Sequence, residues 1–348
     1  MILPVSMSMI TMFNQSSLPK PYPDEALSSW MYRVRITYPE PEIRALSRMN
    51  DHERQTSPFA NSYANFLHGR GKDLDFSFEH PEILEFANTY DLSLEWIKSV
   101  FSPASTQIIP IWLRSDYCLQ CMEESIADID FPVYLKSWRL ILKPFCQKHG
   151  SVLYSADNFL HSSIDFAMSI FEYDSDRLYE LECVAERLKK DAEVQALGRM
   201  VMNRIDSILS EIKDAITHEK VLSFVMTLLR ITLMTASWGN YSSVMKFNVQ
   251  ANKKFEGQNG FPLFYQLPYR VTGMARARSF YLIGLLLGWI DEEQAKNAKQ
   301  RDDFYLVTSA RNFWRRVEYK PRVRTLLSLY STEYLGVSML VSWEYFDV

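Results

Sequence analysis

The sequence "KPFCQKHGSVLYSADN", residues 143–158, decides how the middle of this chain folds, because it contains two metal-ligand side chains at a short spacing. Cys146 and His149 stand three residues apart, so one tight turn can present both side chains. Two such ligands are half of a tetrahedral zinc site. A matching pair is therefore expected elsewhere in the chain.

The matching pair lies upstream in "YCLQC", residues 117–121, where Cys118 and Cys121 have the same spacing. Together the two pairs supply three thiolates and one imidazole, a closed set that leaves no position for water. The predicted cofactor is one structural Zn2+ per chain, with the ligands Cys118, Cys121, Cys146 and His149. The remaining cysteine, Cys183, is expected to be a buried free thiol. His161 is the alternative, substitute ligand.

The composition narrows the classes of function. The chain has 348 residues, 47% of them hydrophobic, and its formal net charge of −4 gives no overall attraction to nucleic acid. Motifs of nucleotide-binding loops, zinc proteases and hydrolases are absent, so we expect a protein that is not an enzyme. A metal nuclease site built from scattered carboxylates is the alternative.

Cysteine usage and hydropathy predict a cytoplasmic protein without membrane contact. Four cysteines are too few for a disulfide framework in a chain of this length and favour a reducing compartment. The longest apolar run, residues 221–238, contains Arg230, and the run at 280–290 is too short to span a bilayer. We interpret both runs as buried helices.

The periodicity predicts a mainly α fold: a helical N-terminal domain with a helix-turn-helix-like element, a small central zinc-finger or ribbon module, and a helical C-terminal domain. Near the N-terminus, Asp24 is expected to cap a helix whose apolar face begins at Leu27, with Arg33 and Arg35 off that face. That face consists of Leu27, Trp30, Met31 and Val34. The predicted boundaries are a disordered tail at 1–17, then domains at 18–111, 112–160 and 161–348.

Residues 81–101 carry the helix-turn-helix signal. Pro81 suits the first turn of one helix, and Ser93 can cap a second helix that carries Leu94, Ile97 and Val100. The small Ala87 and the apolar Ile97 would let the two helices cross closely. An ordinary corner between two helices is the alternative.

A basic stretch near the C-terminus is a candidate contact surface. Between residues 270 and 324 there are twelve Lys or Arg against six Asp or Glu, with Trp314 and Tyr319 interleaved. The predicted nucleic-acid or partner contacts are Arg276, Arg278, Arg311, Arg315, Arg316, Arg322 and Arg324. A solvated helical face is the alternative interpretation.

Two motif blocks resemble the TniQ family of transposon-targeting proteins. The first, "LPKPYPDEALSSWMYRVR", matches the family at Pro21, Asp24, Glu25, Ser29, Trp30 and Arg33. The second, with a Cys-x-x-Cys, a Trp-containing segment and a Cys-x-x-His-Gly-x-x-Leu, matches at Cys118, Cys121, Trp138, Cys146, His149, Gly150 and Leu153. The resemblance covers roughly residues 18–155, and both the order and the spacing of the blocks agree.

The resemblance implies an adaptor that marks a target site and passes it to a transposase through an AAA+ ATPase. Short members associate, as a dimer, with an RNA-guided CRISPR surveillance complex (Cascade), whereas TnsD-type members recognise an attachment site on DNA directly. Many members continue with a second Cys-x-x-Cys where this chain has "YSADNFLHSS". The single zinc unit and the acidic net charge favour the Cascade-associated kind, a homodimer that contacts DNA indirectly or weakly. A TnsD-like DNA-binding protein and a zinc-containing transcription regulator are the alternatives.

Overall fold

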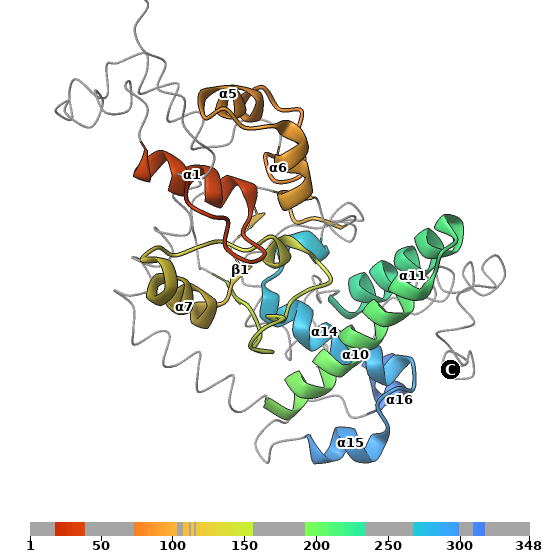
Figure 1. Cartoon of the computed structure of the whole chain (residues 1–348). Helices are drawn as coiled ribbons and strands as arrows, with labels where there is room; N and C mark the ends of the chain where they lie inside the picture. Colours follow the sequence, from red (N-terminus) through yellow and green to blue (C-terminus); the bar gives the residue numbers. More distant parts are fainter. Residues whose placement is uncertain are drawn as a thin grey trace, which may run out of the picture. The chain divides into compact units, whose positions relative to one another are not determined.

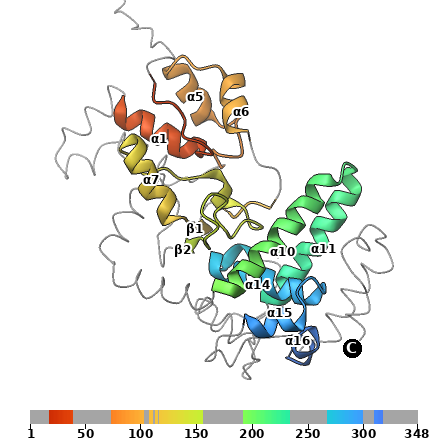
Figure 2. The same ribbon diagram turned by 60° about the horizontal axis from the view of Figure 1, so that its bottom comes forward.

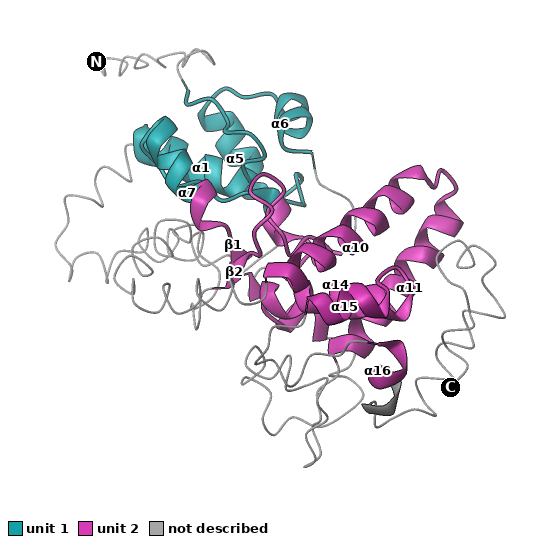
Figure 3. Cartoon of the chain, turned by 90° about the horizontal axis from the view of Figure 1, so that it is seen from below, with its two compact units in different colours: residues 1–106, 122–136, 160–169 teal, residues 107–121, 137–159, 170–348 magenta. Residues whose placement is uncertain are grey.

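A computed structural model describes about half of the chain, in eight stretches. They are residues 18–38, 73–102, 107–110, 113–114, 116–155, 192–233, 267–298 and 309–316. The predicted tail at 1–17 lies outside them, as do Cys183, His161, Arg322 and Arg324. The chain divides into two compact units, shown in Figure 3. Unit 1 holds residues 1–106, 122–136 and 160–169, and unit 2 holds 107–121, 137–159 and 170–348. The segment predicted as the zinc module, 112–160, is thus divided between the two units.

The described residues are mainly α-helical, as predicted, with one two-stranded antiparallel sheet (Figure 1). Towards the N-terminus the helices are α1 (Leu27–Thr37), α5 (Pro81–Thr89), α6 (Leu94–Phe101), α7 (Leu119–Ile129) and the 3-10 helix η3 (Lys136–Arg139). The sheet pairs β1 (Asp116–Tyr117) with β2 (Tyr154–Ser155). The remaining helices are α10 (Ala192–Glu211), α11 (Ala215–Leu233), α14 (Gly273–Leu286), α15 (Glu292–Asn297) and α16 (Ala310–Arg316).

The core of unit 1 forms around the predicted apolar face of α1. The four side chains of that face, from Leu27 to Val34, are fully buried. The Trp30 ring packs against the rings of Phe86, Trp96 and Phe101, with centroids 5.2–5.7 Å apart. Because those three rings come from α5 and α6, one tryptophan joins all three helices into a single core.

The start of α1 differs from the prediction. The residue at its N-cap is Ala26, whose side chain makes no cap, and Asp24 instead adopts a positive φ of 60°. The cap comes from Asp75, which accepts hydrogen bonds from the Ser28 amide at 2.7 Å and the Ser28 hydroxyl at 2.9 Å. The expected capping role of Asp24 is therefore wrong, because a residue 47 positions away satisfies the free N–H group of the first turn.

Arg33 was expected off the apolar face, yet it is buried, 6% exposed, in a polar network inside unit 1. Its Nη2 donates to Glu25 Oε2 at 2.7 Å and to the Lys20 carbonyl at 2.7 Å. Ser29 donates to Glu25, and its Oγ accepts from the Tyr134 amide at 3.1 Å. Arg35 is also buried, and its guanidinium lies over the Phe86 ring. Partners that are distant in sequence thus draw both arginines inside.

The two helices predicted within residues 81–101 are present as α5 and α6. Pro81 occupies the first helical position of α5, and the Ser93 hydroxyl caps α6 by accepting from the Trp96 amide. Ala87 and Ile97 are both buried in the unit 1 core. The local predictions of helix position and capping are confirmed. The interpretation of the pair as a helix-turn-helix stays a prediction.

Unit 2 is built on α10, α11 and α14, which Figure 2 shows side by side. Gly198 of α10 allows a close approach: a Cβ at this position would lie 2.8 Å from the Ala277 carbonyl of α14. The run predicted to be a buried helix at 280–290 supplies the second half of α14, and its side chains from Phe280 to Leu287, glycine aside, are at most 3% exposed. Within the described stretches, no helix combines the length and hydropathy that crossing a membrane requires.

Candidate metal centre

The loop that carries Cys146 and His149 is a tight hairpin held by backbone hydrogen bonds. The Cys146 amide donates to the Ser151 carbonyl at 2.8 Å, and the Gly150 amide donates to the Cys146 carbonyl at 2.8 Å. Gly150 has a φ of +66°, a conformation in which a side chain is strained. The Leu153 amide donates to the Pro144 carbonyl and closes the base of the hairpin. The Cys-x-x-His spacing therefore brings both side chains to the same side of one turn.

The second pair of ligands is placed by the start of a helix. Cys118 stands between β1 and α7, and Cys121 lies in the first turn of α7. Because residues three apart on a helical turn lie on the same face, the two thiols point in one direction. All four residues belong to unit 2, so the site is complete within one compact unit.

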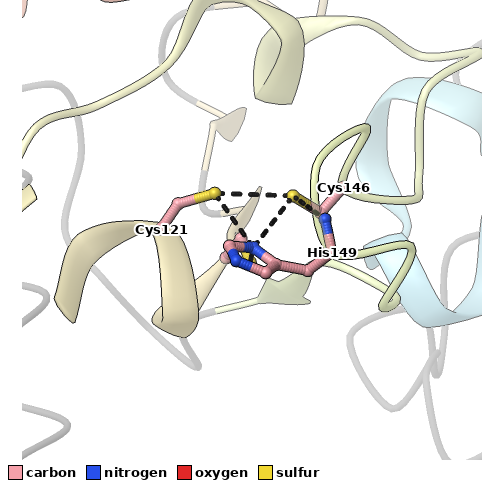
Figure 4. A group of neighbouring side chains, drawn as sticks. Cys121, Cys146 and His149 are labelled. Atoms are coloured by element: carbon pink, nitrogen blue, oxygen red, sulfur yellow. Dashed lines mark hydrogen bonds between the residues drawn. The ribbon is translucent and has the colours of Figure 1, made fainter. Parts of the chain in front are cut away.

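The four side chains converge on one point. Figure 4 labels three of them, Cys121, Cys146 and His149. His149 Nδ1 lies 3.5 Å from Cys118 Sγ, 3.3 Å from Cys121 Sγ and 3.6 Å from Cys146 Sγ. The Sγ atoms of Cys121 and Cys146 are 3.5 Å apart. Zn–S bonds of about 2.3 Å and Zn–N bonds of about 2.0 Å in a tetrahedron give ligand separations of roughly 3.5–3.8 Å. These four separations are close to the tetrahedral values, and all the donor atoms lie within 4.8 Å of one another, so the cluster could hold one ion.

The cluster is buried and reduced. Cys118, Cys121 and Cys146 are at most 3% exposed, and none forms a disulfide. Hydrogen bonds from the Cys118 and Cys121 thiols lower the pKa of Cys146. Hydrogen bonding to Cys118 and then to Cys146 raises the pKa of Cys121. Three thiols this close together therefore carry a single negative charge more readily than three negative charges. A bound cation would stabilise all three thiolates and so displace the remaining protons.

Of the seven predicted arginine contacts, Arg276, Arg278 and Arg311 have described side chains. Arg276 is buried, 1% exposed, where it pairs with Asp116 and donates to the Val271 carbonyl at 2.8 Å. This places Arg276 in the core rather than on a contact surface, because a buried carboxylate holds its guanidinium. Arg278 is half-buried and Arg311 is exposed. The backbones of Arg315 and Arg316 belong to α16, and their side chains lie outside the description.

Arg199 and Asp116 were not predicted from the sequence. They hold in place the metal loop, residues 141–153, and the sheet beside it. Arg199 Nη1 donates to the Gly150 carbonyl at 2.9 Å from α10. Asp116 joins β1 to α14 through Arg276 and the Gly273 amide. A single arginine in a helix, or an acid two residues before a cysteine, has no distinctive spacing, so no local signal could have identified either residue.

Comparisons with known proteins add no assignment: no family model, no curated protein and no solved structure matches this chain. The site therefore has to be interpreted from its own geometry, which defines a buried Cys3His cluster able to bind one metal ion.

Proposed function

We propose that this chain is a zinc-stabilised, non-catalytic adaptor of the TniQ kind, which selects target sites in DNA transposition. In this role it links an RNA-guided CRISPR surveillance complex to the AAA+ transposition ATPase. The observation that carries the proposal is that both motif blocks are present and that each block has a structural role. The residues of the first block build the Glu25–Ser29–Arg33 network, and those of the second build the metal cluster.

The closed ligand set supports a structural ion rather than a catalytic one. Catalytic zinc sites keep one coordination position for water or substrate, whereas four protein ligands fill a tetrahedron. Here three of the four donor side chains are almost inaccessible to solvent. Zinc is the metal proposed, because three thiolates and one imidazole in tetrahedral array are a typical structural zinc set. Metal analysis should find about one equivalent per chain.

The surface charge of α5 and α6 supports protein contact over direct DNA reading. Four acidic side chains on and around these helices are exposed: Glu79, Glu85, Asp91 and Glu95. Lys98 is the one exposed Lys or Arg between residues 79 and 101. A helix pair that enters a DNA groove has to approach phosphates, which an acidic face repels.

Co-purification tests the adaptor role. The chain should fractionate with a guide-RNA surveillance complex when the two are expressed together, and it should bind naked DNA weakly. Tight, sequence-specific binding of an isolated duplex, with affinity that falls steeply as salt rises, would overturn the proposal in favour of a TnsD-like reader.

Charge-reversal variants of the α5–α6 face distinguish a DNA reader from an adaptor that binds a protein partner. Glu85→Lys and Glu95→Lys make the α5–α6 face more positive, so a DNA reader would gain affinity for DNA. An adaptor would gain little affinity for DNA, and it would lose affinity for a protein partner that contacts this face. Glu193→Lys, an exposed substitution on α10, is the matched control for net charge.

A further inference from the structure

The apolar residues of the metal loop belong to the same core as the large helices of unit 2. Ile141, Phe145 and Val152 lie in one hydrophobic cluster with buried side chains of α10, α11 and α14. Phe145 precedes Cys146 directly, is 2% exposed, and reaches α10 close enough that a Cβ on Gly198 would lie 3.4 Å from its ring. The residue next to a ligand is therefore packed into the helical core.

A polar contact ties the loop to α10. Arg199 donates to the carbonyl of Gly150, the residue that follows His149. A Cβ on Gly150 would overlap the Arg199 guanidinium, so the glycine is required both for its backbone conformation and for this contact. Lys143 at the other end of the loop pairs with Asp206, one and a half to two turns further along α10. Contacts from α10 thus flank the two ligands.

The other ligand pair is tied to α14. Asp116, two residues before Cys118, pairs with Arg276, and both side chains are at most 3% exposed. The Gly273 amide at the start of α14 donates to Ser155 Oγ at 3.0 Å and to Asp116 Oδ1 at 3.2 Å. Gly273 also lies against Leu153, where a Cβ would come within 2.8 Å of the carbonyl oxygen. The sheet that flanks the metal cluster is therefore anchored to the N-terminus of α14.

From these contacts we propose that the metal cluster, α10 and α14 form one cooperative folding unit. The ion is then an internal cross-link of unit 2, not the centre of a detachable zinc finger, and metal occupancy determines whether α10 and α14 stay packed. Arg199 is a positioning residue: it holds the turn that presents Cys146 and His149. This inference rests on the metal cluster alone and uses no part of the proposed adaptor role, so either one can fail without the other.

Hydrogen exchange of the full chain, with and without a zinc chelator, tests the cooperative unit. Chelation should raise amide exchange in α10 and α14 at least tenfold, together with exchange in residues 117–121 and 137–153. Peptides from α1 and α5 should be unchanged and serve as the internal control, because they belong to unit 1. Loss of protection confined to residues 117–121 and 137–153 would overturn the proposal and define an independent finger.

A pair of arginine variants tests the positioning role. Arg199→Ala should weaken metal affinity, measured by competition with a chelating indicator, about 10- to 100-fold, the usual effect of removing a group that orients a ligand. Arg204→Ala is the matched control: it lies on the same helix and is exposed, and its guanidinium stacks over Trp289 at 4.3 Å. Equal metal affinities for the two variants would refute the role of Arg199.

Discussion

The buried pair of Asp116 and Arg276 gives a sharp test of how unit 2 is held together. In the Arg276→Met variant the side-chain volume is nearly kept and the charge is lost. The Asp116 carboxylate then keeps the uncharged donors Ser155 Oγ and the Gly273 amide but loses the charge of Arg276. Removing one partner of a buried ion pair typically costs about 3–5 kcal/mol. We expect a loss of stability of that size in unit 2.

Amide exchange in α14 measures this loss within a chain whose two units need not unfold together. A destabilisation of 3 kcal/mol corresponds to an increase of roughly 150-fold in the exchange rate of amides that open only on unfolding of the unit. The matched control is Lys296→Met, which removes an exposed pair with Glu292 in α15, where the two side chains are 66% and 63% accessible. Exposed pairs at this helical spacing contribute about 0.3–0.5 kcal/mol.

A double variant identifies the cause. Asp116→Asn combined with Arg276→Met removes both charges and keeps an oxygen that can accept from Gly273, so it should recover part of the lost stability. Two outcomes would refute the explanation that Asp116 keeps a buried charge after losing Arg276. One is equal effects of Arg276→Met and Lys296→Met, and the other is a double variant less stable than Arg276→Met alone.

Three further outcomes are expected. Cys146→Ser should reduce metal content well below one equivalent, and full metal retention would contradict the ligand set. Trp30→Ala should destabilise unit 1 by about 3–5 kcal/mol in denaturant unfolding, because the side chain is fully buried; a loss below about 1 kcal/mol would contradict its central place. Burial raises the pKa of Glu25 more than Arg33 lowers it. Between pH about 4.5 and the folded pKa, the folded state therefore keeps a proton on Glu25 that the unfolded state has released. The stability of unit 1 should therefore fall as pH rises from about 4.5 through the folded pKa, and Glu25→Gln should lack that slope.

The metal ligands could be predicted from sequence because their geometry is local. Two residues three apart on a turn come together whatever the rest of the chain does, so each pair was visible on its own. Helix periodicity was equally informative for α1, where the four apolar positions are all buried. Pro81 at the first position of α5 and the Ser93 cap of α6 act locally and were predictable for the same reason.

What could not be predicted depends on contacts between residues distant in the sequence. Asp75 caps α1 from 47 residues away, and Arg276 meets Asp116 across 160 residues. Composition placed Arg276 in a basic stretch, but charge density along the sequence does not reveal which guanidinium a buried carboxylate captures. The helices of unit 2 likewise carried no sign that they pack on the metal loop, since Gly198 and Gly273 have no spacing pattern that marks a close approach.

Within the described residues, each unit holds a polar network that involves residues of one of the two motif blocks. In unit 1, Glu25 accepts from Arg33 and Ser29, and the Ser29 hydroxyl accepts from the Tyr134 amide, so the block fixes α1 to residues 131–136. In unit 2, the metal ligands and Asp116 fix the loop and sheet to α10 and α14. A substitution in the first block should therefore change hydrogen exchange only in unit 1, and one in the second block only in unit 2. The residues of the two blocks thus lie in different compact units, each with contacts of its own.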